Sequence, residues 1–198
     1  TASFAIDTLG TVTISTYAPI PSGAPATTTP TPIPNVSLAI HGAKTIGTDA
    51  VGGPLYKMQV ATTTNTNGTR SFLAEWDLYD ISLPTNSIYA IVEQCPVSGQ
   101  LAPGSLLDEK LTLINKPDHS LRVAVSGNGS PLSGSSVSLS GPFVATSTTS
   151  ACGQTFFSNI LSGTYSVTIS ASGFAPYIES FYISGQAFLP VSLSISQQ

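Results

Sequence analysis

The chain carries one pattern twice. A Thr-rich stretch that ends in aromatic residues recurs after a proline-led segment: the copies are residues 60–72 after 32–38, and residues 144–157 after 131–139. They lie 84 residues apart at Val60 and Val144 and 86 apart at Tyr79 and Tyr165, so they differ by small insertions. Two copies of one small unit predict two similar β domains in tandem. Neither copy carries an obvious reactive group, which lowers the odds of an enzyme.

Hydroxyl side chains replace charged ones in this chain. Serine and threonine make up 53 of 198 residues, whereas charged residues are only 8%, against roughly 25% in an average soluble domain. Such a surface suits a crowded extracellular setting or an acidic medium, because hydroxyl groups do not titrate there. The net charge of −4 and six scattered cations argue against a nucleic-acid partner, which needs a basic stripe.

The N-terminus and three glycosylation sequences indicate where the protein is located. The chain begins at Thr1 and has no segment of the roughly 18 apolar residues that a membrane span needs. It is therefore either a recombinant fragment or a secreted protein without its signal peptide. Asn35, Asn67 and Asn128 each begin an Asn-x-Ser/Thr acceptor sequence, and these favour secretion. We expect an extracellular protein with N-linked glycans.

The two cysteines, Cys95 and Cys152, fall one in each predicted domain. They are either two buried free thiols or, in an oxidising compartment, a disulfide. We expect the disulfide, which would close a loop of 57 residues and could lock the two domains together.

Apolar and polar residues alternate with strand periodicity along most of the chain. Ala2, Phe4 and Ile6 fall on one face of a predicted strand over residues 1–8. Further strands are expected at 11–16, 36–41, 55–62, 69–73, 78–83, 87–93, 109–114, 121–125, 136–140, 143–148, 155–159, 164–171, 178–183 and 186–195. A short helix near 105–110 is compatible with the irregular stretch 96–108. The regular alternation and the turn residues at the junctions predict antiparallel β-sandwiches.

The fold class is therefore all-β, with two tandem antiparallel β-sandwich domains of the Ig-like or transthyretin-like kind. Residues 1–10 form an N-terminal strand. Residues 11–117 form the first domain, in which 18–34 is a long loop with six prolines. Residues 118–198 form the second domain, after a polar boundary at 115–118.

A set of short motifs in the second domain has a counterpart in a known family. These motifs are Pro131-Leu132 before Val137-Ser138-Leu139, the Thr-rich strand 146–149, Gly153 before Phe157, Gly163-Thr164-Tyr165, Gly173-Phe174 and Val191-Ser192-Leu193. Residues 121–195 thus resemble the carboxypeptidase regulatory-like, transthyretin-like β-sandwich family. Gly163 would make a tight turn, and Tyr165 would close one end of the core with its hydroxyl seeking a partner. Residues 11–114 look like a diverged member. The resemblance implies a structural or binding module without chemistry of its own.

The chain as a whole resembles the subunits of archaeal thread-type pili. It shares with them a Ser/Thr-rich composition, glycosylation sequences, two sandwiches and a leading strand. The resemblance implies head-to-tail assembly by donor-strand complementation, in which a strand of one copy completes a sheet of the next. Ala2, Phe4 and Ile6 would anchor that strand in the next copy. The alternative is that residues 1–8 form an ordinary edge strand of their own domain.

Residues with catalytic or metal-binding chemistry are few and scattered. His41 and His119 have no cysteine or carboxylate partner at metal-ligand spacing, and no Gly-x-Ser-x-Gly elbow occurs. Glu75, Asp77 and Asp80 beside Trp76 would suit a sugar, but a buried core position is the simpler expectation for the tryptophan. We expect no catalytic residues, no metal and no cofactor.

The sequence therefore predicts a non-enzymatic structural subunit of an extracellular filament, such as a pilus or thread. Its partners would be neighbouring copies of itself and N-linked glycans, with no nucleic acid and no membrane span. A secreted cell-surface adhesion or glycan-binding module is the alternative, and a hydrolase ranks last.

Overall fold

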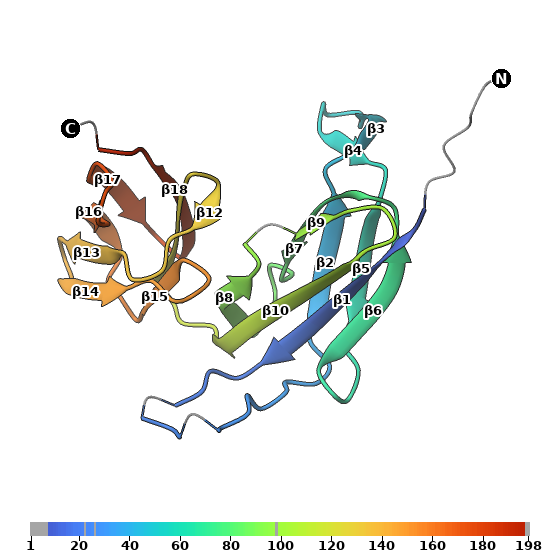
Figure 1. Cartoon of the computed structure of the whole chain (residues 1–198), viewed down its shortest axis with the longest axis horizontal. Helices are drawn as coiled ribbons and strands as arrows, with labels where there is room; N and C mark the ends of the chain where they lie inside the picture. Colours follow the sequence, from blue (N-terminus) through green and yellow to red (C-terminus); the bar gives the residue numbers. More distant parts are fainter. Residues whose placement is uncertain (1–7, 22, 26, 98, 197–198) are drawn as a thin grey trace. The chain divides into compact units, whose positions relative to one another are not determined.

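The computed structural model describes residues 8–21, 23–25, 27–97 and 99–196. Every regular element in this part of the chain is a β-strand (Figure 1), which confirms the all-β prediction. The described residues divide into two compact units. The first unit lies within 1–89 and 98–113, and the second within 90–97 and 114–198.

The first unit is built of two sheets and a small hairpin. Its strands are β1 (Gly10–Tyr17), β2 (Ser37–Gly42), β3 (Thr45–Thr48), β4 (Pro54–Tyr56), β5 (Gln59–Thr63), β6 (Thr69–Ala74), β7 (Asp77–Ser82), β9 (Gly99–Leu101) and β10 (Leu106–Asn115). One sheet has the order β6-β1-β10-β8, in which β1 lies between an antiparallel β6 and a parallel β10, and β8 (Tyr89–Cys95) is the edge strand next to β10. The other sheet has the order β5-β2-β7-β9, and β3 pairs with β4.

The second unit has a simpler strand set. It contains β11 (Ser120–Gly127), β12 (Ser130–Pro131), β13 (Ser136–Ser140), β14 (Ala145–Thr148), β15 (Gln154–Ser158), β16 (Gly163–Ser170), β17 (Tyr177–Ile183) and β18 (Gln186–Leu193). Residues 90–95 of β8 group with this unit as well. In one sheet, β11 lies between an antiparallel β15 and a parallel β18, and β12 pairs with the end of β11. The other sheet has the order β14-β13-β16-β17.

The two units therefore repeat one topology. The three-strand set β6-β1-β10 corresponds to β15-β11-β18, and β5-β2-β7-β9 corresponds to β14-β13-β16-β17. Each unit also joins its first and last long strands in parallel, although alternation alone predicted antiparallel sheets throughout. Periodicity reports which face of a strand is buried and carries no information about the direction of its neighbour.

The repeat extends to individual hydrogen bonds in the turn after each Thr-rich strand. The amide of Thr16 donates to the Gly68 carbonyl at 2.8 Å, and the amide of Val125 donates to the Gly153 carbonyl at 2.7 Å. Both glycines have positive φ, 71° and 70°. Each turn is closed by a polar side chain that accepts main-chain N–H groups, Asn65 in the first unit and Ser150 in the second.

A buried tyrosine occupies the same place in both units. The hydroxyl of Tyr79 donates to the Glu75 carbonyl, and that of Tyr165 donates to the Leu161 carbonyl, both at 2.8 Å and both four residues back. Their exposed fractions are 2% and 0%. This is a tyrosine-corner arrangement, in which the ring closes one end of the core and the hydroxyl satisfies a loop carbonyl. The expected role of Tyr165 is confirmed, and Tyr79 shares it.

The inward face of each strand forms the core, as alternation requires. In the second unit, Leu121, Val123 and Val125 are buried on β11 and face Val137 and Leu139 on β13, along with the rest of this apolar cluster. In the first unit, Val12 and Ile14 on β1 and Leu38 and Ile40 on β2 have exposed fractions of 1% or less. Burying each such side chain contributes about 1.5–3 kcal/mol before chain entropy is counted.

Two local predictions are wrong. The expected helix near 105–110 is the start of β10, in which Leu107 and Leu111 alternate inward as strand residues do. The single strand predicted at 55–62 is split into β4 and β5. The split arises because residue Lys57 closes a local hairpin through a main-chain bond to Lys44, and strand β3 of that hairpin was not predicted.

Candidate functional site

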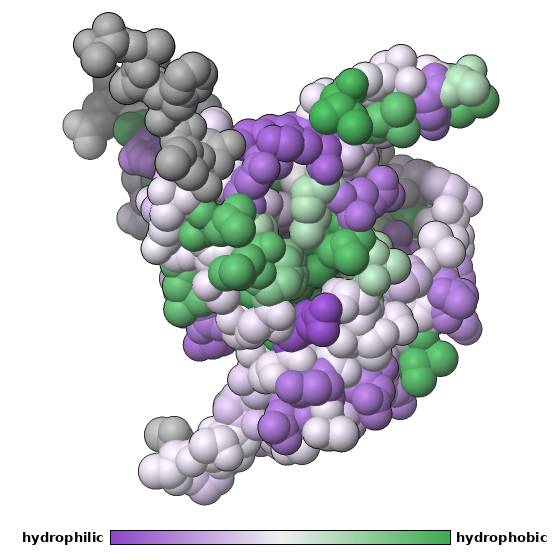
Figure 2. Space-filling view, turned by 90° about the vertical axis from the view of Figure 1, so that its right-hand side faces the viewer, coloured by the Kyte–Doolittle hydropathy of each residue, from purple (hydrophilic) through white to green (hydrophobic). Residues whose placement is uncertain are grey.

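An apolar area marks one side of the first unit. It lies on the side of the molecule where β5 and β6 are found, and Figure 2 shows it as a contiguous green region. Exposed apolar side chains on or beside these two strands are Leu9, Val60 and Leu73, with exposed fractions of 48%, 37% and 67%. Contiguous apolar surface of this kind commonly marks an interaction site.

The strands below this area are sheet edges. Within the described residues, β5 pairs only with β2 and β6 pairs only with β1. The main-chain groups on the outer side of such an edge can pair with an added strand. The apolar area thus coincides with two backbone edges that are open to further pairing.

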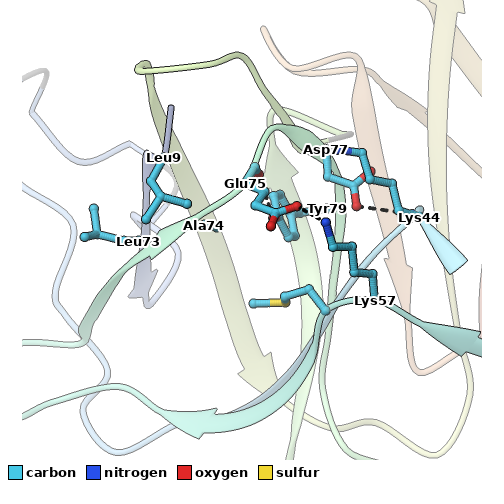
Figure 3. A pocket seen from close by; sticks show the side chains of 9 residues that line it. Leu9, Lys44, Lys57, Leu73, Ala74, Glu75, Asp77 and Tyr79 are labelled. Carbon is cyan, nitrogen blue, oxygen red and sulfur yellow. Dashed lines mark hydrogen bonds and ion pairs between the residues drawn. The ribbon is translucent and has the colours of Figure 1, made fainter. Parts of the chain in front are cut away.

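A cavity of about 240 Å³ opens at one end of these edges. It is lined by Leu9, Lys44, Lys57, Met58, Leu73, Ala74, Glu75, Asp77 and Tyr79. Figure 3 shows the apolar side chains Leu9 and Leu73 at one side and the charged side chains of Lys44 and Asp77 at the other. The cavity is thus amphipathic, with an apolar wall toward β6 and a polar rim toward β7.

The polar rim is held by short-range charge contacts. Lys57 Nζ lies 2.5 Å from Glu75 Oε2, and Lys44 Nζ lies 3.3 Å from the centre of the Trp76 ring. The main-chain amide of Lys44 donates to Asp77 Oδ2 at 3.1 Å. Both ions of the Lys57–Glu75 pair are partly exposed, so the pair orders the rim more than it stabilises the fold.

The expected core position of Trp76 is wrong. Its side chain is 46% exposed and stacks under the Lys44 ammonium, where the ring quadrupole attracts the cation. The buried aromatic of this region is Tyr79, three residues later. The acidic residues named with Trp76 do not converge on its ring: Asp77 is largely buried, and Asp80 lies 3.4 Å from His41 Nε2.

Burial raises the pKa of Tyr79, and the neighbouring Asp77 and Glu75 carboxylates raise it further. Desolvation and negative neighbours both disfavour the tyrosinate. This pKa shift links the stability of the first unit to alkaline pH.

We expect the stability of the first unit to fall as pH rises above about 10, the ordinary pKa of tyrosine. Because the pKa is raised in the folded state, the unfolded chain loses its proton first, and folding becomes less favourable as pH rises. Tyr79→Phe should cost about 1 kcal/mol below that pH, and the cost should shrink above it. Urea unfolding followed by Trp76 fluorescence at about pH 9 and about pH 11 would measure this. A cost that is the same at both pH values would contradict the linkage.

The ring of His41 contacts two other side chains and the Gly42 carbonyl in the first unit. Its ring stacks on Tyr56 with the centroids 4.0 Å apart, and its Nε2 approaches Asp80. In the described residues, no group of three or more His, Cys, Asp or Glu side chains could hold a metal ion. The stacking of His41 on Tyr56 of β4 attaches the β3–β4 hairpin to the sheet that contains β2.

Of the other predicted site residues, the three asparagines are described by the structure and the three strand anchors are not. Asn35, Asn67 and Asn128 are all exposed, and Asn35 and Asn128 have positive φ of 57° and 52°. Ala2, Phe4 and Ile6 lie outside the described residues. Nothing brings the three asparagines together, since they belong to separate turns.

Cys95 and Cys152 form a disulfide, with their Cα atoms 5.7 Å apart. Both cysteines lie in the second unit, because 90–97 belongs to that unit. Two neighbouring contacts accompany the bond: the Gln94 amide donates to Gln154 Oε1 at 3.2 Å, and Ser150 Oγ donates to Glu93 Oε1. The bond and these contacts attach β8 to the turn before β15.

Sequence reasoning missed the two edge strands as a binding surface. Leu73 was available as a signal, since it follows the apolar Phe72 directly and breaks the alternation of β6.

One family model matches part of the chain. Residues 120–195 match the carboxypeptidase regulatory-like domain, which agrees with the resemblance seen in 121–195 and covers most of the second unit. No curated protein sequence matches the chain. The structure contains no helix that is long and apolar enough to cross a membrane, within the residues it describes.

Several solved structures are similar to this chain. The shaft pilin SpaA from Lactobacillus rhamnosus GG is 10% identical, with 96% of this chain and 99% of that chain covered and a TM-score of 0.36. GBS52, the minor pilin of Streptococcus agalactiae, is 13% identical, with 96% and 97% covered and a TM-score of 0.37. A streptococcal ancillary pilin is 12% identical, with 96% and 63% covered and a TM-score of 0.35.

Proposed function

We propose that this protein is a non-enzymatic, structural subunit of an extracellular filament. Copies join head to tail, and the N-terminal strand of each copy, residues 1–8, completes a sheet of the next. Ala2, Phe4 and Ile6 are the anchors of that strand. The contact repeats without closing on itself, so it generates a filament and not a ring.

The observation that supports this function best is the apolar surface on the unpaired edges of β5 and β6. An added strand satisfies such edges through main-chain hydrogen bonds, while its alternate side chains enter the apolar surface. The N-terminal segment has the matching chemistry, with three apolar residues at alternate positions. A hydroxyl-rich surface with 8% charged residues suits an extracellular polymer, and Asn35, Asn67 and Asn128 remain predicted acceptors of N-linked glycans.

Deletion of residues 1–8 should abolish filaments and leave folded monomers. The deletion ends before β1, so it removes no strand of the described core. Electron microscopy of the intact and truncated proteins, together with their sedimentation, would measure assembly. The far-ultraviolet circular dichroism of the truncated protein serves as the folding control. Filaments of normal length from the truncated protein would rule the proposal out.

A further inference from the structure

We propose that the acceptor for the N-terminal strand is the seam between β5 and β6 of the first unit. The seam is the gap between the two sheets along their β5 and β6 edges, and Met58, Val60 and Phe72 line it. The occupant is residues 1–8 of a second copy of this chain. This inference rests on the proposed function and adds to it the location of the acceptor.

Side chains that point into the first unit are incompletely covered along this seam. Val60 pairs with Ile40, which is 1% exposed, yet Val60 itself is 37% exposed. Phe72 pairs with Val12, which is 0% exposed, yet Phe72 is only half-buried. The strand register aims both residues toward the core, and their exposure shows that this side of the core lacks a cover.

The second unit shows the same seam closed. Phe157 pairs with Leu121 as Phe72 pairs with Val12, and Phe157 is only 6% exposed. Beside it, Thr155 is 7% exposed and its hydroxyl donates to Ser147 Oγ, at 2.7 Å, across from β15 to β14. The corresponding residue in the first unit is Arg70, which pairs with Ile14 and is exposed.

One topology thus gives two different seams. The second unit seals its edges with small hydroxyl side chains, so its β14 and β15 need nothing further. The first unit carries a long cation, Arg70, where the second has Thr155, and it carries Val60 where the second has Ala145. These longer side chains leave the seam of the first unit open. Each copy therefore offers a single acceptor of this kind, in the first unit.

The length and pattern of the N-terminal segment fit the open seam. β5 has five residues and β6 has six, and residues 1–8 span both with an alternating apolar face. Phe4 is the middle anchor and Val60 is the middle inward residue between Met58 and Thr62. A centred strand brings Phe4 to Val60 whether it runs parallel or antiparallel to β5, so this pair can be tested without knowing the direction.

The first test changes the seam and keeps the N-terminus. Val60→Lys should abolish filaments, because the added strand would have to bury an unpaired ammonium group. It should also weaken binding of a synthetic peptide of residues 1–8 to the truncated monomer at least ~10-fold. Val144→Lys is the matched control: Val144 is 75% exposed beside β14 of the second unit, and this change should leave filaments and peptide affinity unaltered. Far-ultraviolet circular dichroism is the folding control for both variants, because Val60 points toward the core and is only partly exposed.

The second test traps the contact directly. A Phe4→Cys, Val60→Cys protein should form covalent ladders of two, three and more copies on oxidation, whereas Phe4→Cys, Val144→Cys should not. If deletion of 1–8 stops assembly while Val60→Lys does not, and ladders form only with Val144→Cys, the filament proposal stands and the seam is not the acceptor. If neither the deletion nor Val60→Lys affects assembly, both proposals fail.

Discussion

Gly153→Ala should destabilise the second unit by about 3 kcal/mol, from strain at positive φ together with overpacking. Gly153 has a φ of 70°, and a Cβ there would lie 2.5 Å from the Val125 carbonyl oxygen, 2.9 Å from Pro131 Cβ and 3.0 Å from the Leu132 amide nitrogen. Most of these neighbours belong to the backbone, so they cannot rotate away. The turn that precedes β15 would have to move off β11.

Gly134→Ala separates the two causes. Gly134 has a similar φ of 74°, but nothing lies within 4 Å of a Cβ placed there. Its substitution should therefore cost only the left-handed strain, about 1 kcal/mol. Chemical denaturation, followed by hydrogen exchange of the β11 amides, would measure the free energy of unfolding of the second unit. If both variants lost the same free energy of unfolding, the close contacts at Gly153 would contribute nothing to the cost of its substitution.

Removal of the disulfide should be the largest single loss of stability. Cys95→Ala with Cys152→Ala should lower the free energy of unfolding of the second unit by about 4 kcal/mol, since the bond closes a long loop in the unfolded chain. The sequence separation is 57 residues. Strand β8 should then exchange its amide protons faster than β11, because β8 is the edge strand next to β10, whereas β11 lies between β15 and β18.

The fluorescence of Trp76 gives an internal comparison for this double variant. It is the only tryptophan in the chain and lies in the first unit, so its unfolding transition should shift less than hydrogen exchange in β11. A larger shift at Trp76 than at β11 would contradict the assignment of the bond to the second unit.

The sequence was a good guide wherever one face of a strand is buried. Alternation predicted β13 at its observed bounds and β11, β15 and β16 to within two residues, because period-two burial is a local property. The Gly-Thr-Tyr motif likewise predicted a buried tyrosine with a hydrogen-bonded hydroxyl. Tyr79 and Tyr165 are confirmed as equivalent positions, since the repeat preserves the ring and its carbonyl acceptor.

The sequence was a poor guide where long-range pairing decides. The parallel neighbours β10 and β18 lie far along the chain from β1 and β11, so no local pattern reveals them. Short strands such as β3 and β9 have few residues with which to show a period. The exposure of Trp76 follows from Lys44, which lies 32 residues away and supplies the ring with a cation.

The candidate seam could not be predicted from the sequence, because it too depends on long-range pairing. Its residues look apolar and ordinary in the sequence, and only their incomplete burial distinguishes them from the core. Comparison of Phe72 with Phe157 requires both registers to be known. The repeat was visible beforehand, but the difference between its two copies was not.

The parallel pairing of the first and last long strands has a mechanical consequence. Tension on the chain pulls the start of β1 and the end of β10 in opposite directions along neighbouring strands, and the same holds for β11 and β18. In this geometry the force acts in shear, so all the ladder hydrogen bonds between the two strands must break together. If the two strands were antiparallel, the same force would break the hydrogen bonds one after another. Each unit is thus built to resist stretching along the direction in which its own backbone enters and leaves.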